Sequence, residues 1–309
     1  MDKPLVTIGV AVYNGAKYIV ETLDSINDQT YSNIEIVIVD DGSSDDSFKF
    51  CNQWSVNSRF PIRVQKGGIN LGLTKTCNVI LNQANGKYLQ LFDQDDIMLP
   101  EKIEHDVAVF EELNDKVALI YSKMKLIDEN GKLMEQEYNE RIGFDGVHPG
   151  DAFGHLIKNN FIPAPTVMLR TEYVKITGGY DESILFNDWD MWLKVARDFE
   201  ISFTDVTNVR YRIHSQSMMA GRGIQQEIER NEIKIRMIKK HLGLSKKHDR
   251  IIFEKLKELY VYSYFLEDKN AKDYLDGYLK KKFDLKIWLY HKLAIAGIKH
   301  PSNFKIFLN

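Results

Sequence analysis

Apolar runs and amphipathic stretches alternate along the first third of the chain. The apolar runs are continuous and rich in β-branched residues, which is typical of strands buried on both faces of a sheet. They comprise residues 5–12, 34–40, 62–64 and 87–92. The intervening stretches carry apolar residues at helical spacing and comprise residues 16–29, 45–56 and 72–84. This alternation predicts an α/β fold, with a mainly parallel sheet covered by helices on both faces.

Further helices and strands are expected up to about residue 220, at less regular spacing. In chain order they are a helix from 100 to about 113, a strand over 117–128, a short helix closing the irregular segment 141–160, a strand over 164–170 and a helix over 188–199. The turn sequence at 128–131 is expected to join the preceding strand to a return strand. The last helix places Trp189, Trp192, Leu193 and Ala196 on one face, which predicts that this face is buried.

The chain changes character near residue 220. From Gly221 the pattern is helical almost to the end, with interruptions at Gly243, around Asn270 and at Pro301. Residues 221–309 hold 20 Lys and Arg against 11 Asp and Glu, a net charge of +9, whereas the rest holds 21 against 33, or −12. We therefore expect an α/β domain over 1–220 and a basic helical region over 221–309.

Composition indicates an ordinary globular protein. Hydrophobic residues make up 44% of the chain and charged residues 28%. The two cysteines, Cys51 and Cys77, form no CxxC pair, which fits a reducing compartment. The amino terminus lacks a basic n-region and a cleavage site, and no stretch is long enough to span a bilayer. A cytoplasmic location is therefore expected.

Polar clusters follow three of the predicted strands. They are Tyr13-Asn14-Gly15, the run from Asp40 to Ser44, and the run from Asp93 to Asp96. Each cluster alone suits a turn or a helix cap. In open α/β sheets, however, ligands gather at the carboxyl ends of the strands. Because all three clusters occur at strand ends, in order, a functional site is the favoured interpretation.

The third cluster has the spacing of a metal site. Asp93 and Asp95 flank Gln94, and carboxylates this close together need a counter-charge if they are buried. A hard divalent cation would supply it and keep positions open for phosphate oxygens. The alternative is a solvated loop that caps the helix beginning near Pro100. The chain has no GxxxxGK[ST] motif and no GxGxxG after the first strand, which disfavours kinase-like and dehydrogenase functions.

Taken in order, these motifs resemble those of family 2 glycosyltransferases with a GT-A fold. The resemblance covers about residues 5–217. It rests on VYNG, VDDGSSDDS, the NLG at 70–72, GKYLQLFDQDD, GGYDE, NDWDMWL and YRIHSQS. It implies a Rossmann-like GT-A domain with a C-terminal helical appendage. Two positions depart from the family pattern: Asn187 stands where many relatives have Glu, and Cys77 where many have Arg.

The resemblance also implies roles for individual residues in binding the donor nucleotide. Tyr13, Asp40 and Asp41 fall where the family holds the nucleoside, commonly uridine. Asn70 and Gly72 fall in the loop that flanks the donor. The donor implied is a nucleotide-sugar, specifically a UDP-sugar.

Four further residues correspond to the family's metal site and catalytic base. Asp95 is expected to contact a divalent metal, Mn²⁺ or Mg²⁺, and Asp93 lies nearer the ribose or the metal. His214 falls where some relatives use a histidine as a further metal or diphosphate ligand, and a plain surface histidine is the alternative. Asp188 matches the acid that deprotonates the acceptor in inverting members. Its alternative is a helix cap.

The implied activity is transfer of a sugar to an acceptor hydroxyl in the synthesis of a polysaccharide, lipopolysaccharide or related glycan. One alternative is a non-catalytic module that binds nucleotide-sugars or glycans on the same fold. A nucleotidyltransferase is disfavoured, because YNGAKY after the first strand is not a phosphate-binding loop.

The extreme C-terminus has its own signature. Residues 277–309 hold seven Lys and one Asp among Trp, Tyr, Leu and Ile residues. Such a segment suits peripheral contact with an anionic membrane, at the inner face of the cell membrane and close to a lipid-linked acceptor. It equally suits helices packed on the acidic domain with lysines in water. Nucleic acid is not an expected partner, because the main domain is acidic.

Overall fold

The structure is a computed structural model that describes residues 3–135, 151–184, 187–215 and 223–298. Much of the irregular segment 141–160 and the end of the basic segment therefore lie outside the described residues. The chain forms two compact units. The first comprises Met1–Leu156 with Asn160–Ala220, and the second comprises Gly221–Asn309 with Ile157–Asn159.

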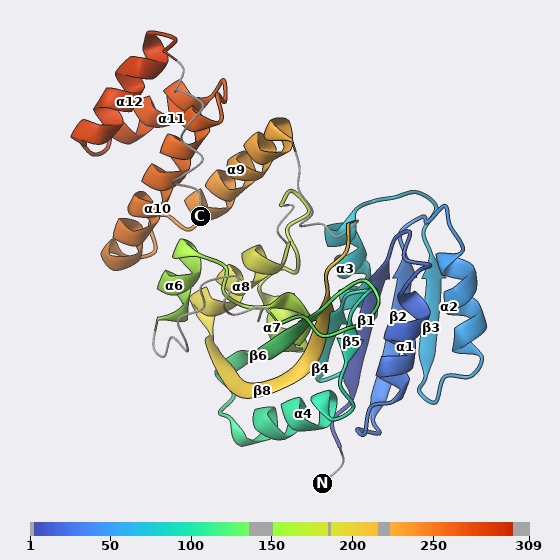
Figure 1. Cartoon of the computed structure of the whole chain (residues 1–309). Coiled ribbons are helices and arrows are strands. Elements are labelled where there is room, and N and C mark those ends of the chain that lie inside the picture. The colour runs from blue at the N-terminus through green and yellow to red at the C-terminus, as the bar shows by residue number, and fades with distance from the viewer. Residues whose placement is uncertain (1–2, 136–150, 185–186, 216–222, 299–309) are drawn as a thin grey trace. The chain divides into compact units, whose positions relative to one another are not determined.

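The first unit is built on an eight-stranded mixed sheet in the order β3-β2-β1-β4-β7-β6-β8-β5 (Figure 1). The strands are β1 (Val6–Val12), β2 (Ile34–Asp40), β3 (Ile62–Lys66), β4 (Tyr88–Phe92), β5 (Ile97–Met98), β6 (Val117–Ile127), β7 (Met168–Arg170) and β8 (Glu200–Arg212). β3, β2, β1 and β4 are parallel neighbours. Their carboxyl ends therefore meet at one edge, where the predicted polar clusters lie.

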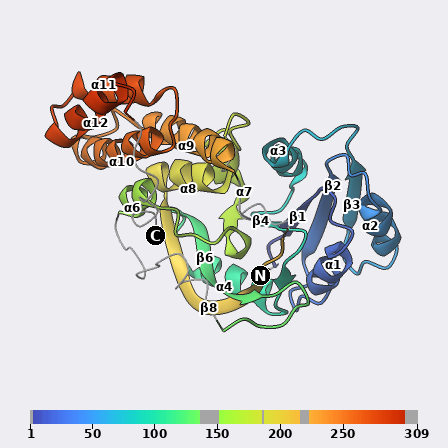
Figure 2. The ribbon, with the colours of Figure 1, turned by 45° about the horizontal axis from the view of Figure 1, so that its top comes forward.

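Helices cover both faces of these parallel strands. The helices of the first unit are α1 (Ile19–Asn27), α2 (Ser47–Ser55), α3 (Leu73–Gln83), α4 (Lys102–Glu112), α6 (Ala152–Lys158, of which the last two residues belong to the second unit), α7 (Thr171–Ile176) and α8 (Asn187–Asp198). Figure 2 shows α3 on one face of β1–β3 and α1 and α2 on the other. A Cβ at Gly9 would lie only 2.3 Å from Cγ2 of Ile80, so glycine in β1 is what lets α3 pack this closely.

Two parts of this unit differ from the sequence-based expectation. The predicted strand over 164–170 is wrong in its first half: Ala164–Thr166 is a 3₁₀ turn, and only Met168–Arg170 pairs with its neighbours. Prolines 163 and 165 have no N–H to donate to a strand neighbour. Strand β8 was not expected at all. Its sequence alternates apolar and polar residues at 200–204 and again at 208–212, but the alternation is broken between these stretches.

The second unit is helical. Its helices are α9 (Ile224–Lys239), α10 (Lys246–Phe265), α11 (Ala271–Leu279) and α12 (Leu285–Ile295). Asn231 of α9 donates to the carbonyl of Leu259 and to Ser263 Oγ, which joins α9 to α10. The rings of Tyr260 and Tyr274 stack with centroids 5.3 Å apart, which joins α10 to α11. Across the described parts of the chain, no helix is both long enough and apolar enough to cross a membrane.

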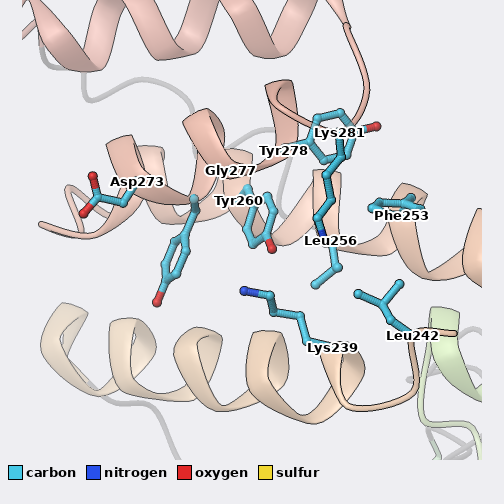
Figure 3. A pocket seen from close by; sticks show the side chains of 10 residues that line it. Lys239, Leu242, Phe253, Leu256, Tyr260, Asp273, Gly277, Tyr278 and Lys281 are labelled. Carbon is cyan, nitrogen blue, oxygen red and sulfur yellow. The ribbon is translucent and has the colours of Figure 1, made fainter.

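A hollow lies among α9, α10 and α11 (Figure 3). It is lined by the buried residues Leu256 and Tyr260 and by the exposed residues Lys239 and Lys281, among others. No residue predicted from the motifs lines it. The candidate site therefore lies in the first unit.

Candidate functional site

The loops after β1 and β4 are joined by an amide side chain. The backbone N–H of Tyr13 donates to Oε1 of Gln94 at 2.9 Å, and Nε2 of Gln94 donates to the carbonyl of Tyr13 at 3.1 Å. A Cβ at Gly15 would lie 2.2 Å from Oε1 of Gln94, so only glycine leaves room for this amide. Tyr13 itself is 45% exposed, so its ring is accessible to a ligand. Gln94 was not singled out from the sequence, although it sits between the two predicted ligands Asp93 and Asp95.

The two aspartates after β2 have different surroundings. Asp40 is fully buried; its Oδ1 accepts from the N–H of Ser43 at 3.1 Å, whereas its Oδ2 has no hydrogen-bond partner within the described residues. Asp41 accepts from the N–H groups of Leu71 and Gly72, both at 2.8 Å. The carboxylate of Asp41 therefore fixes the loop that precedes α3.

That loop also contains Asn70, another predicted donor-binding residue. A Cβ on Gly42 would lie 2.8 Å from the carbonyl carbon of Ile69 and 2.9 Å from the nitrogen of Asn70. Gly42 has a φ of +77° and Gly72 a φ of +92°, both in the region that favours glycine. The side chain of Asn70 is exposed. The structure thus brings Asp41, Asn70 and Gly72 together, with the side chain of Asn70 open to a ligand.

Three acidic residues crowd the loop after β4. Burial, together with the charges of Asp95 and Asp188, raises the pKa of Asp93 to about 7. Burial, together with the charges of Asp93 and Asp95, also raises the pKa of Asp96 well above its usual range. Oδ2 of Asp95 lies 2.8 Å from Nε2 of His214, which follows β8. The loop is therefore rich in carboxylates that a cation would stabilise.

Arg212 braces this loop from β8. Its backbone N–H donates to Oδ1 of Asp96 at 2.8 Å, and its Nε donates to the carbonyl of Asp95 at 2.8 Å. The guanidinium also pairs with Glu21 of α1 at 2.7 Å and lies over the ring of Tyr18, 4.7 Å from the centroid. Arg212 fixes the acidic loop from a strand more than a hundred residues away. The only signal for it in the sequence was its place in the YRIHSQS motif.

Asp188 lies in the first turn of α8. Burial raises its pKa above the usual range. Hydrogen bonds from the backbone N–H of Trp189 and from Asn160 act in the opposite direction, and Nδ2 of Asn160 lies 3.0 Å from Oδ2 of Asp188. Because the charge of Asp188 also raises the pKa of Asp93, the two carboxylates are within electrostatic reach of each other. Asn160 was not identified from the sequence, and no motif points to it.

The donor atoms of the acidic loop fit a divalent cation. Carboxylate oxygen and imidazole nitrogen, as in the Asp95–His214 pair, are common ligands of divalent metals. In the described part of the chain, no three His, Cys, Asp or Glu side chains are close enough to hold an ion on their own. A cation bound by Asp95 and His214, with Asp93 nearby, would therefore need oxygens from a substrate to complete its coordination.

Sequence comparisons relate the chain to known transferases. Residues 7–157 match the family described as "Glycosyl transferase family 2". An uncharacterized glycosyltransferase of Rickettsia bellii is 30% identical over 217 residues, 69% of this chain and 30% of that protein. The glucosyltransferase WfaP of Escherichia coli is 29% identical over 239 residues, 77% of this chain and 88% of that protein. The chain thus spans about a third of the length of some relatives and most of others.

Structural comparisons agree on the fold. The S. aureus TarS fragment 1-349 in complex with UDP-GlcNAc superposes with a TM-score of 0.67 and 20% identity, covering 96% of this chain and 84% of that one. The Pyrobaculum calidifontis mannosyltransferase PcManGT, in complex with GDP-Man and Mn²⁺, superposes with a TM-score of 0.64 and 17% identity, covering 96% and 81%. The predicted GT-A fold with C-terminal helices is confirmed by these likenesses.

Proposed function

Because the chain belongs to glycosyl transferase family 2, we propose that it transfers a sugar from a nucleotide-sugar donor to an acceptor hydroxyl, with the help of a divalent cation. The observation that carries the proposal is the convergence of acidic groups at one edge of the sheet. Asp93 and Asp95 follow β4, and Asp188 comes from α8 nearly a hundred residues later. Burial raises the pKa of Asp93, and the charges of Asp95 and Asp188 raise it further, which supports this arrangement.

The proposed donor is a UDP-sugar. Support comes from TarS, whose structure contains UDP-GlcNAc, and from WfaP, whose name specifies UDP-Glc. In this chain Tyr13, Asp40 and Asp41 would hold the nucleoside. The loop with Asn70 and Gly72, which Asp41 fixes, would lie against the donor. The partnerless buried Oδ2 of Asp40 suits an acceptor of a hydrogen bond from a ligand N–H or O–H group.

The proposed cation is Mn²⁺ or Mg²⁺, held by Asp95, Asp93 and His214. PcManGT supports this assignment, because its structure contains Mn²⁺. When bound, the cation would stabilise the negative charge that develops on the departing nucleotide diphosphate. Cys77 is buried and offers the phosphates no charge, so the cation would carry this task without help from that position.

Asp188 would act as the catalytic base. A sugar hydroxyl is a poor nucleophile near neutral pH, so a carboxylate must take its proton as its oxygen attacks the anomeric carbon. The oxygen forms a bond to that carbon while the bond from the carbon to the diphosphate oxygen breaks. If attack comes from the side opposite the diphosphate, a single displacement inverts the anomeric configuration. The raised pKa of Asp188 makes it a stronger proton acceptor than an ordinary exposed aspartate.

The proposed acceptor is a growing polysaccharide, lipopolysaccharide or related glycan carried on a lipid. WfaP supports this class, because its name specifies a GlcNAc-diphosphoundecaprenol acceptor. The proposed place of action is the cytoplasmic face of the cell membrane. Cys51 and Cys77 are buried and form no disulfide within the described residues, which is compatible with a reducing compartment.

The proposal is tested by supplying a panel of UDP- and GDP-sugars with Mn²⁺ or Mg²⁺ and measuring nucleoside diphosphate release. We expect slow metal-dependent hydrolysis of one donor, accelerated by a glycan acceptor. Tight binding of a donor with no release of diphosphate, with and without acceptors, would instead favour the non-catalytic binding module.

Replacing Asn160 with alanine is expected to shift the pH dependence of transfer. Asp188 works in its deprotonated form, so activity is present above its pKa and is lost as the pH falls through it. Removing the Asn160 N–H takes away a hydrogen bond that stabilises the carboxylate. The pKa of Asp188 then rises further, and the acid limb of the kcat/KM profile moves to higher pH.

The matched control is Asn159→Ala, because Asn159 is an exposed neighbour without a hydrogen bond to Asp188 in the described part of the chain. We expect its profile to follow that of the wild type. A purely structural role for Asn160 would lower activity at every pH without moving the acid limb, and that result would refute the assignment.

A further inference from the structure

We propose that the outward face of α12, continued by Phe283 and Ile298, is a docking surface for an anionic phospholipid bilayer. The proposal names a membrane as the partner of the second unit. It rests on the proposed function only for the reason such binding would be useful, which is access to a lipid-linked acceptor. Its physical basis lies in α12 and the residues that flank it.

One face of α12 is firmly packed within the second unit. Ile287 is fully buried, and the ring of Tyr290 lies 5.4 Å from that of Tyr264 in α10. Asp284 caps the helix by accepting from the N–H groups of the first turn, and it pairs with Lys257 of α10 at 2.5 Å. The orientation of α12 on its own unit is therefore fixed.

The opposite face of α12 is apolar and exposed to solvent. Leu285, Trp288, Leu289 and Ile295 are 70%, 41%, 51% and 51% exposed. Spacings of three, four and seven residues place them on one side of the helix. Phe283, just before the helix, is 71% exposed. The outer apolar face of such a helix gains no hydrophobic free energy while it is exposed to water. Contact with another apolar phase would bury this face and stabilise it.

The surroundings of this face are positively charged. Lys281, Lys286 and Lys292 have no carboxylate partner within the described residues. Lys292 lies on the apolar face itself, with its ammonium 5.7 Å from the ring centroid of Trp288. The single acid between 277 and 298, Asp284, is already paired with Lys257. Exposed apolar groups among unpaired lysines match the boundary between acyl chains and anionic headgroups.

This charge also argues against a second copy of the chain as the occupant. A symmetric dimer through this face would bring the same three lysines of each copy together, and like charges facing each other weaken association. An anionic bilayer complements them. Long lysine side chains can also keep their ammonium groups in the headgroup layer while their stems lie along apolar surface.

The test is sedimentation of the full chain with vesicles of pure phosphatidylglycerol or pure phosphatidylcholine, without donor or acceptor. We expect binding to phosphatidylglycerol vesicles and little to phosphatidylcholine. The double variant Leu285→Ser/Leu289→Ser and the triple variant Lys281→Gln/Lys286→Gln/Lys292→Gln should each bind at least about tenfold more weakly. All the altered side chains are exposed, so thermal unfolding should be unchanged.

Two controls match these variants in the first unit. Val56→Ser removes an apolar side chain that is 82% exposed, and Lys116→Gln removes an exposed lysine. Both should bind as the wild type does. Brominated acyl chains should quench tryptophan fluorescence in the wild type and lose that effect in Trp288→Phe.

Several results would overturn the proposal. They are failure of the wild type to bind phosphatidylglycerol vesicles, unchanged binding in the double variant, and a dimer in light scattering that the double variant abolishes. Diphosphate release from a nucleotide-sugar is measured without vesicles. Failure to bind vesicles would therefore leave the proposed transfer activity untouched, and failure to release diphosphate would leave the proposed membrane contact untouched.

Discussion

Replacing Asp188 with asparagine is expected to lower kcat for sugar transfer by about 10²–10⁴-fold, the range that a positioned general base contributes. Asparagine preserves the shape of the side chain but cannot accept the acceptor's proton. Its effect should fall on kcat, because the donor nucleotide is assigned to Tyr13, Asp40 and Asp41 at strand ends, and not to α8. Donor affinity, measured by calorimetry with the unreactive nucleoside diphosphate, should be unchanged.

The matched control is Asp198→Asn at the opposite end of the same helix. Asp198 is partly exposed and pairs with its neighbour Arg197, outside the acidic cluster. Its neutralisation should leave the rate within about twofold, as expected for an exposed ion pair. Equal rates for wild type and Asp188→Asn would remove Asp188 as the base. Loss of nucleotide binding in Asp188→Asn would instead indicate a role in shaping the site.

Replacing Asp95 with alanine is expected to reduce metal-dependent turnover by about 10²–10³-fold, comparable to the loss of one preorganised electrostatic group in an active site. Asp95 is the carboxylate that meets His214, so this change removes one of the two ligands in contact. Binding of Mn²⁺, followed by electron paramagnetic resonance in the presence of nucleoside diphosphate, should weaken in parallel with the rate.

The variant is not expected to be unstable. Asp95 repels Asp93 and Asp96 in the folded protein, and its removal relieves that repulsion. The thermal midpoint should therefore stay the same or rise. Asp115→Asn is the control, because the side chain of Asp115 is 96% exposed. Undiminished turnover and Mn²⁺ binding in Asp95→Ala would show that the cation is held elsewhere.

The local pattern of the chain was sufficient to predict the half of the sheet that carries most of the site. β1, β2 and β4 are mainly apolar, and a strand buried on both faces has few alternatives to a parallel α/β sheet. Since such strands present their carboxyl ends together, the sequence predicts that the clusters after them lie at one edge. The match to family 2 confirms the predicted family, and the likeness to TarS confirms the predicted fold.

The far half of the sheet did not follow from local pattern. β8 has no continuous apolar run, and its alternation of apolar and polar residues is broken between 204 and 208. Yet β8 carries Arg212 to the acidic loop and leads directly to His214. The pairing of Asn160 with Asp188 likewise depends on how a loop and a helix pack, which no spacing in the sequence encodes.

The basic C-terminus shows the same division of information. The sequence by itself determined its charge and its helical, apolar character, and these suited either a packed helix or a membrane contact. Only the tertiary structure decided that α12 has one packed face, with Ile287 buried, and one exposed apolar face, which includes Leu285. The composition of a helix sets how much apolar surface it can bury. Which of its faces is buried depends on the elements that pack against it, and those elements come from other parts of the chain.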